Sequence, residues 1–87
     1  MEDTIAAIAT SSGIASIGII RISGKETFNI IKKIFKTNKE LTIEPNTIKY
    51  GHIEYQGKKI DEVLVSFFVK PHSFTKEDVC EINCHGG

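Results

Sequence analysis

The sequence predicts an α+β domain with a mixed β-sheet of about five strands and one main helix, in the order β-β-α-β-β-β. Three observations lead to this fold class: a run rich in β-branched residues at 17–23, a segment of helical periodicity directly after it, and two extended runs joined by Gln56-Gly57. The composition, 40% hydrophobic and 25% charged, is that of an ordinary globular protein. We therefore expect residues 1–87 to form one domain without a flexible linker.

The first two strands are expected at residues 4–10 and 17–23. The first segment is short and apolar and is followed by Ser11-Ser12-Gly13, which is typical of a buried strand that enters a loop. The second segment carries β-branched side chains on both of its faces. This is the pattern of a central strand that is covered on two sides.

The helix is expected from Gly24 to about Thr37. Ser23 is positioned as an N-cap, and Glu26 three residues later completes the pattern of a capping box. Apolar side chains then recur at helical spacing, at Phe28, Ile31, Ile34 and Phe35. Lysines gather toward the end of this segment, where the helix dipole favours positive charge.

The second half of the chain is expected to be entirely extended. Residues 47–55 and 59–69 form two runs whose junction, Gln56-Gly57, is a weaker form of the Asn-Gly hairpin signal. A polar turn at residues 71–78 separates them from a last strand at 79–85.

The charges argue against a domain that binds nucleic acid by itself. Eleven basic residues balance eleven acidic ones, so the chain lacks the global positive field that attracts phosphate backbones. Five lysines are nevertheless clustered, which predicts a solvated helix face, or alternatively a contact with RNA or an acidic partner: Lys25, Lys32, Lys33, Lys36 and Lys39.

The chain is expected to be cytoplasmic and to stay out of membranes. No apolar run approaches the ~20 residues that span a bilayer, and Met1-Glu2-Asp3 lacks the basic start of a secretory signal. Cys80 and Cys84 are four apart in a predicted strand, which places their Cα atoms about 13 Å apart. We expect free thiols, as in a reducing compartment.

Arg21 is the first candidate for a functional residue, because it is the one charge inside a strand that is otherwise apolar. A guanidinium cannot lose its charge, and burying it unpaired is very costly. It therefore requires an anion, which could come from across the sheet, from another chain, or from a ligand carboxylate or phosphate. An intramolecular salt bridge or a side chain that reaches to solvent is the simpler interpretation.

Glu81 is the second candidate. Strand alternation places Glu81 on one face with Val79, Asn83 and His85, whereas Cys80, Ile82 and Cys84 form the apolar face. A carboxylate there can accept two parallel N–H donors, which suits an arginine fork or the amino-lactam edge of a pterin or guanine ring. A glutamate that simply faces solvent is the alternative.

Other motifs predict no chemistry of their own. Cys80, Cys84, His85 and His72 lack the spacing of a zinc site, so we expect no metal. Ser73-Phe74-Thr75-Lys76 matches Ser-x-x-Lys without its companion motifs, and the glycines at 13 and 18 lack the Lys-Ser/Thr of a phosphate loop. We expect no catalytic residue in this chain.

Four segments are specific in their order and spacing and extend over nearly the whole chain: Asp3-Thr4-Ile5-Ala6-Ala7-Ile8-Ala9-Thr10, Ile17-Gly18-Ile19-Ile20-Arg21-Ile22-Ser23-Gly24, Ile60-Asp61-Glu62-Val63-Leu64, and residues 73–87 with Glu81-Ile82-Asn83-Cys84-His85-Gly86-Gly87. Together they resemble the N-terminal domain of the tRNA uridine-modification GTPase family MnmE (TrmE, ThdF). Ser11-Ser12 and Ala15-Ser16 stand where that family usually has Pro-Pro and Gly-Gly, and Lys76 replaces a usual glycine.

The resemblance implies a fold similar to the folate-binding domain of the glycine-cleavage aminomethyltransferase. It implies that residues 1–87 are a truncated N-terminal tetrahydrofolate-binding and dimerisation domain, without the helical and GTPase domains of the parent. Arg21 and Glu81 fall on the family's folate-contacting arginine and glutamate, for a ligand of the 5-formyl-tetrahydrofolate type.

The resemblance also implies what the parent protein does. It hydrolyses GTP with Mg and K in the missing GTPase domain, so this fragment alone is expected to have no GTPase site. With a FAD-containing partner protein, the parent adds an aminomethyl-type group to C5 of the wobble uridine of tRNA, which this fragment is not expected to bind strongly. Two alternatives stay open: a structural dimerisation module without folate, and a stand-alone aminomethyl-transfer enzyme, which needs far more chain.

Overall fold

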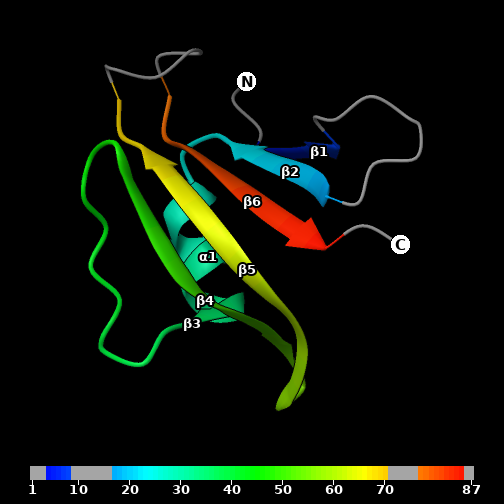
Figure 1. Cartoon of the computed structure of the whole chain (residues 1–87). Helices are drawn as coiled ribbons and strands as arrows, with labels where there is room; N and C mark the ends of the chain where they lie inside the picture. Colours follow the sequence, from blue (N-terminus) through cyan, green and yellow to red (C-terminus); the bar gives the residue numbers. More distant parts are fainter. Residues whose placement is uncertain (1–3, 9–16, 71–76, 86–87) are drawn as a thin grey trace.

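A computed structural model describes residues 4–8, 17–70 and 77–85. Among these residues, one six-stranded sheet has the order β1-β2-β6-β5-β4-β3, and helix α1 lies against one of its faces (Figure 1). The α+β class and the order of the main elements are confirmed. All pairings among the described strands are antiparallel, so the parallel pairs of a mixed sheet are not found in this part of the chain. The elements are β1 (Ile5–Ile8), β2 (Ile17–Ser23), α1 (Thr27–Ile34), β3 (Phe35–Lys36), β4 (Thr47–Tyr55), β5 (Lys58–Phe68) and β6 (Val79–His85).

Strand positions follow the sequence closely. β2, β4 and β6 have the predicted bounds, and β5 begins and ends one residue earlier than expected. β1 covers residues 5–8 of the segment predicted at 4–10. Residues 9 and 10 and most of the turn predicted at 71–78 lie outside the described residues. The two-residue β3, which pairs with β4, was not expected.

The helix is shorter than predicted, and the capping box is wrong. Helix α1 begins at Thr27, has Glu26 at its N-cap position, and makes no capping hydrogen bond from that side chain. The Ser23 hydroxyl donates instead to Glu77 at 3.0 Å. Gly24 has a φ of 136°, a left-handed conformation that cannot continue a helix, so the chain turns there before the helix starts.

Gln56 and Gly57 form the predicted hairpin turn between β4 and β5, and both have positive φ angles, 53° and 79°. Positive φ at both central residues is the signature of a type I′ turn, whose twist matches that of the strands it joins. This short connection aligns β4 with β5 over nearly their whole length.

The core lies between α1 and the sheet. Its buried side chains come from the helix, from β3 and from alternate positions of β2, β5 and β6: Ile22, Ile31, Phe35, Val63, Val65, Phe67, Cys80 and Ile82. Leu41 and Ile43, in the loop of residues 37–46, pack against the same cluster. The helix and this loop therefore cover the same face of the sheet.

The opposite face, here called the open face, carries the other set of alternate side chains. Cross-strand partners place Ala7, Arg21, Glu81, Ser66 and Ile48 in one row across five strands. Large apolar side chains on this face are well exposed: 63% for Ile5, 65% for Ile48, 59% for Tyr50 and 44% for Leu64. The described residues thus leave much of the open face uncovered.

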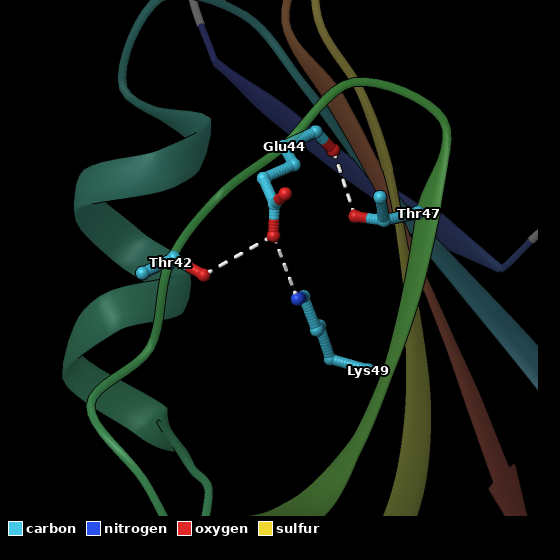
Figure 2. Close-up of polar contacts among 4 residues, drawn as sticks. All are labelled: Thr42, Glu44, Thr47 and Lys49. Atoms are coloured by element: carbon cyan, nitrogen blue, oxygen red, sulfur yellow. Dashed lines mark hydrogen bonds and ion pairs between the residues drawn. The ribbon is translucent and has the colours of Figure 1, made fainter.

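A polar contact holds the loop of residues 37–46 against β4. Glu44 accepts hydrogen bonds from Lys49 at 2.9 Å and Thr42 at 3.3 Å, and its carbonyl accepts one from the Thr47 hydroxyl at 2.7 Å (Figure 2). The hydrogen bond and charge of Lys49 lower the pKa of Glu44. Figure 2 shows the Thr42 and Lys49 side chains pointing to the Glu44 carboxylate and the Thr47 hydroxyl pointing to the Glu44 carbonyl.

The lowered pKa predicts a pH dependence of stability. A carboxyl whose pKa is lower in the folded state contributes stability above its unfolded pKa, and this contribution is lost as the pH falls through the folded value. We expect urea unfolding between about pH 5 and pH 3 to show a steeper loss of stability for the wild type than for Glu44→Gln. Parallel stability curves would contradict a role for the Lys49 contact.

Candidate functional site

Arg21 and Glu81 face each other at the centre of the open face. They are direct cross-strand partners on the adjacent strands β2 and β6, although 60 residues separate them in the sequence. Both positions follow from strand alternation, because Ile22, Cys80 and Ile82 point to the core. Of the anions considered for Arg21, the structure provides a carboxylate from the neighbouring strand of the same sheet.

The two side chains form a close ion pair. Arg21 donates from Nε to Glu81 Oε2 at 2.7 Å, and its Nη2 lies 2.5 Å from the same oxygen. The side chain of Glu81 is 18% exposed and that of Arg21 is 43% exposed. Both contacts converge on Oε2. The second carboxylate oxygen, Oε1, accepts no hydrogen bond from any described residue. The pair leaves a fixed acceptor that a ligand can use.

Ser66 and Asn83 are further polar residues beside this pair. Ser66 on β5 is the cross-strand partner of Glu81, and Asn83 lies two residues farther along β6 on the same face. Sequence alternation placed Asn83 on the face of Glu81 but did not single out Ser66. The missing signal was the β5–β6 register, which depends on packing and cannot be read from either strand alone.

Two cavities lie elsewhere. One of about 340 Å³ is lined by apolar side chains on the helix side of the sheet, among them Ile20, Ile34 and Cys84. Another of about 220 Å³ lies between the loop of residues 37–46 and β4, beside Lys49 and Tyr50. Among the described residues, neither of these two cavities is lined by Arg21 or Glu81.

Those remaining candidates that the structure describes are not brought together into a second cluster. Cys80 and Cys84 are free thiols, and the described residues include no group of three or more His, Cys, Asp or Glu side chains able to hold a metal ion. The five clustered lysines are all exposed. His72, Lys76, the Ser-x-x-Lys segment, and the substitutions at 11–12 and 15–16 lie outside the described residues. No helix in the described ranges has the length and apolar character needed to cross a membrane.

The two thiols should differ in reactivity. Burial raises the pKa of the Cys80 thiol to about 12 from an ordinary value of 9.0. The pKa of the half-buried Cys84 is raised by burial and by the charge of Asp61. Because the thiolate is the reactive form, iodoacetamide at about pH 8.5 should label Cys84 slowly and Cys80 only after unfolding.

The same shift gives a stability prediction at high pH. The neutral Cys80 thiol stabilises the fold below pH 9, and this contribution is lost as the pH rises from 9 toward 12.

Mass spectrometry of the iodoacetamide-labelled peptides, with and without urea, tests the difference in reactivity between Cys80 and Cys84. Equal labelling of both cysteines in the folded protein would contradict the burial of Cys80.

Comparison with known proteins now decides the family. The family profile described as "GTP-binding protein TrmE N-terminus" matches residues 4–87. The chain belongs to this family. It is 54% identical over 92 residues to the tRNA modification GTPase MnmE of Alkaliphilus metalliredigens, a match that covers 100% of this chain and 20% of the relative. It is 55% identical over 85 residues to MnmE of Streptococcus mutans, covering 98% of this chain and 19% of the relative.

The match to MnmE concerns one part of a larger protein. The chain spans about a fifth of the length of the curated relatives it matches. The resemblance inferred from the sequence is confirmed, since both the family profile and the relatives cover nearly all of the chain. The 87 residues correspond to an N-terminal domain of MnmE.

Proposed function

We propose that this chain is the folate-binding and homodimerisation domain of a tRNA modification GTPase, with Arg21 and Glu81 as contacts for a 5-formyl-tetrahydrofolate type ligand. One observation carries the proposal: a partly buried arginine–glutamate pair, at 2.7 Å, lies on a sheet face that the described residues leave uncovered. An ion pair on an uncovered face adds little stability, because solvent screens the charges. Stabilisation alone therefore does not explain why the pair lies there.

The chemistry of a reduced folate suits these side chains. Its pterin ring presents adjacent amino and ring N–H donors, which a carboxylate accepts well. Glu81 Oε1 is the acceptor that no described residue uses. Arg21 fixes the orientation of the carboxylate through Oε2, and a guanidinium is chemically suited to a pterin oxygen or a tail carboxylate.

In the parent protein, the folate would supply the one-carbon unit for the modification. A FAD-containing partner would act with the parent to build an aminomethyl-type group on C5 of the wobble uridine of tRNA. GTP, Mg and K would be bound by the GTPase domain, outside this chain. This domain would then have no catalytic residue of its own and would bind and orient the folate.

A second candidate function is a dimerisation module that does not bind folate. The Arg21–Glu81 pair, in which each charge already has a protein partner, favours it, as does the position of both cavities away from the pair. The exposed Ile5, Ile48, Tyr50 and Leu64 suit a protein interface equally well. The two candidates make different predictions for ligand binding.

Calorimetric titration of the intact protein with 5-formyl-tetrahydrofolate separates them. The folate proposal predicts saturable binding with one ligand per chain, and sedimentation velocity should show a dimer with or without ligand. A dimer that releases no heat and shows no thermal stabilisation by the folate would favour the purely structural module. A monomer under all conditions would contradict the dimerisation proposal.

A further inference from the structure

Three polar groups that bond to no described residue gather at one place on the open face. They are Glu81 Oε1, the Asn83 amide and the Ser66 hydroxyl. Within the part of the chain that the structure describes, neither the Asn83 nor the Ser66 side chain makes a hydrogen bond. Both residues are partly buried. A polar group in such a position keeps its bonding capacity for water or for a ligand.

Neighbouring polar side chains behave differently. On the same face, the Ser23 hydroxyl bonds to Glu77, the Tyr50 hydroxyl bonds to Glu62, and His52 lies 2.6 Å from Glu54. The polar groups that bond to no described residue therefore lie at the centre of the face, around Glu81.

The sheet fixes the spacing of the three groups. Ser66 is directly opposite Glu81, and side chains in such positions have Cβ atoms about 5 Å apart. Asn83 is two residues along β6, a separation of about 6.8 Å between backbone positions. Leu64, opposite Asn83, adds an apolar surface that is 44% exposed. The result is a polar strip with an apolar flank, on the scale of a bicyclic heterocycle.

The polar groups along β6 have a defined order. Glu81 only accepts hydrogen bonds, whereas the Asn83 amide both donates and accepts. A 2-amino-4-oxo-pyrimidine edge presents two N–H donors followed by a carbonyl acceptor. Such an edge laid along β6 pairs its ring N–H with Glu81 Oε1 and its carbonyl with the Asn83 N–H. Pterins and guanine share this edge.

We infer that Asn83 and Ser66 are ligand-contacting residues. The Asn83 amide donates a hydrogen bond to the carbonyl of a pterin's amino-lactam edge, and the Ser66 hydroxyl on β5 hydrogen-bonds to the ring system. This inference rests on the proposed folate function and adds a pose to it. The heterocycle lies along β6 with its recognition edge from Glu81 to Asn83, and the apolar flank at Leu64 contacts its face.

Titration of the intact protein with 5-formyl-tetrahydrofolate tests the inference. Asn83→Leu should weaken binding about tenfold, and Ser66→Ala about threefold, the loss expected for a neutral hydrogen bond. Asn83→Gln, which keeps the amide, should recover most of the affinity. Thermal unfolding checks that each variant is folded, and Asn83→Ala replaces Asn83→Leu if the leucine variant is not.

The outcomes separate this inference from the proposed function. Failure of the wild type to bind the folate would overturn both. Wild-type binding that Glu81→Gln weakens, but that the Asn83 and Ser66 variants leave unchanged, would overturn only the roles of Asn83 and Ser66. Guanosine monophosphate carries the same edge and should bind more weakly than the folate; equal or tighter binding of the nucleotide would overturn the assignment to a pterin.

Discussion

Replacement of Phe67 by alanine should leave most of the protein unfolded at 25 °C. The side chain is fully buried in the middle of the core, and its ring packs edge-to-face on Phe28 with centroids 6.0 Å apart. Removing such a ring costs about 3–5 kcal/mol, because contacts are lost and a cavity remains. Native stability starts at about 0.05 kcal/mol per residue, or about 4 kcal/mol for 87 residues, so a loss of this size can remove all of it. Urea unfolding followed by circular dichroism measures the effect.

The matched control for Phe67→Ala is Ile48→Ala. Ile48 lies on β4 next to Thr47, the cross-strand partner of Phe67, but its side chain is on the open face and is 65% exposed. Its replacement should change the free energy of unfolding by less than about 0.5 kcal/mol. A Phe67→Ala protein within about 1 kcal/mol of the wild type would contradict the packing of α1 on the sheet.

The second large effect concerns Arg21. Replacing it with methionine keeps most of the side-chain length and removes the charge, so the Glu81 carboxylate loses the group that orients it. We expect ligand affinity to fall about tenfold to a hundredfold, because a charge-assisted contact is lost and the acceptor is no longer held in place. The cost in stability should be smaller, about 1 kcal/mol, since Arg21 is 43% exposed and solvent screens the pair.

A double-mutant cycle with Glu81→Gln tests whether the two residues act as one unit. Side chains in contact give non-additive effects, so Arg21→Met should weaken ligand binding much less in the Glu81→Gln background than in the wild type. Additive losses would mean that Arg21 contacts a separate part of the ligand, such as its tail carboxylate, and would contradict an orienting role.

Most of the sheet could be predicted from the sequence. The bounds of β2 follow from a run of β-branched residues, those of β4 and β6 follow from alternation, and Gln56-Gly57 identified the hairpin. These features are local, because alternation and turn chemistry act over a few residues. Arg21 and Glu81 were recognisable for the same reason: each is a charge within a strand whose neighbours are apolar.

What could not be predicted depends on contacts between distant segments. The capping box at Ser23 matched the local pattern, but the hydroxyl bonds Glu77, and Gly24 takes a left-handed φ with its backbone against Thr4. The pairing of β2 with β6, which brings Arg21 opposite Glu81, likewise joins residues that are 60 apart in the sequence. Neither strand carries that information alone.

The most direct test of the central claim, that Glu81 on the open face contacts a folate, is calorimetric titration of the intact Glu81→Gln protein with 5-formyl-tetrahydrofolate. The amide keeps the shape of the side chain but loses the charged acceptor, so affinity should fall about a hundredfold. Glu40→Gln, which changes an exposed glutamate in the loop of residues 37–46, should bind like the wild type. Wild-type affinity in the Glu81→Gln protein would contradict the claim.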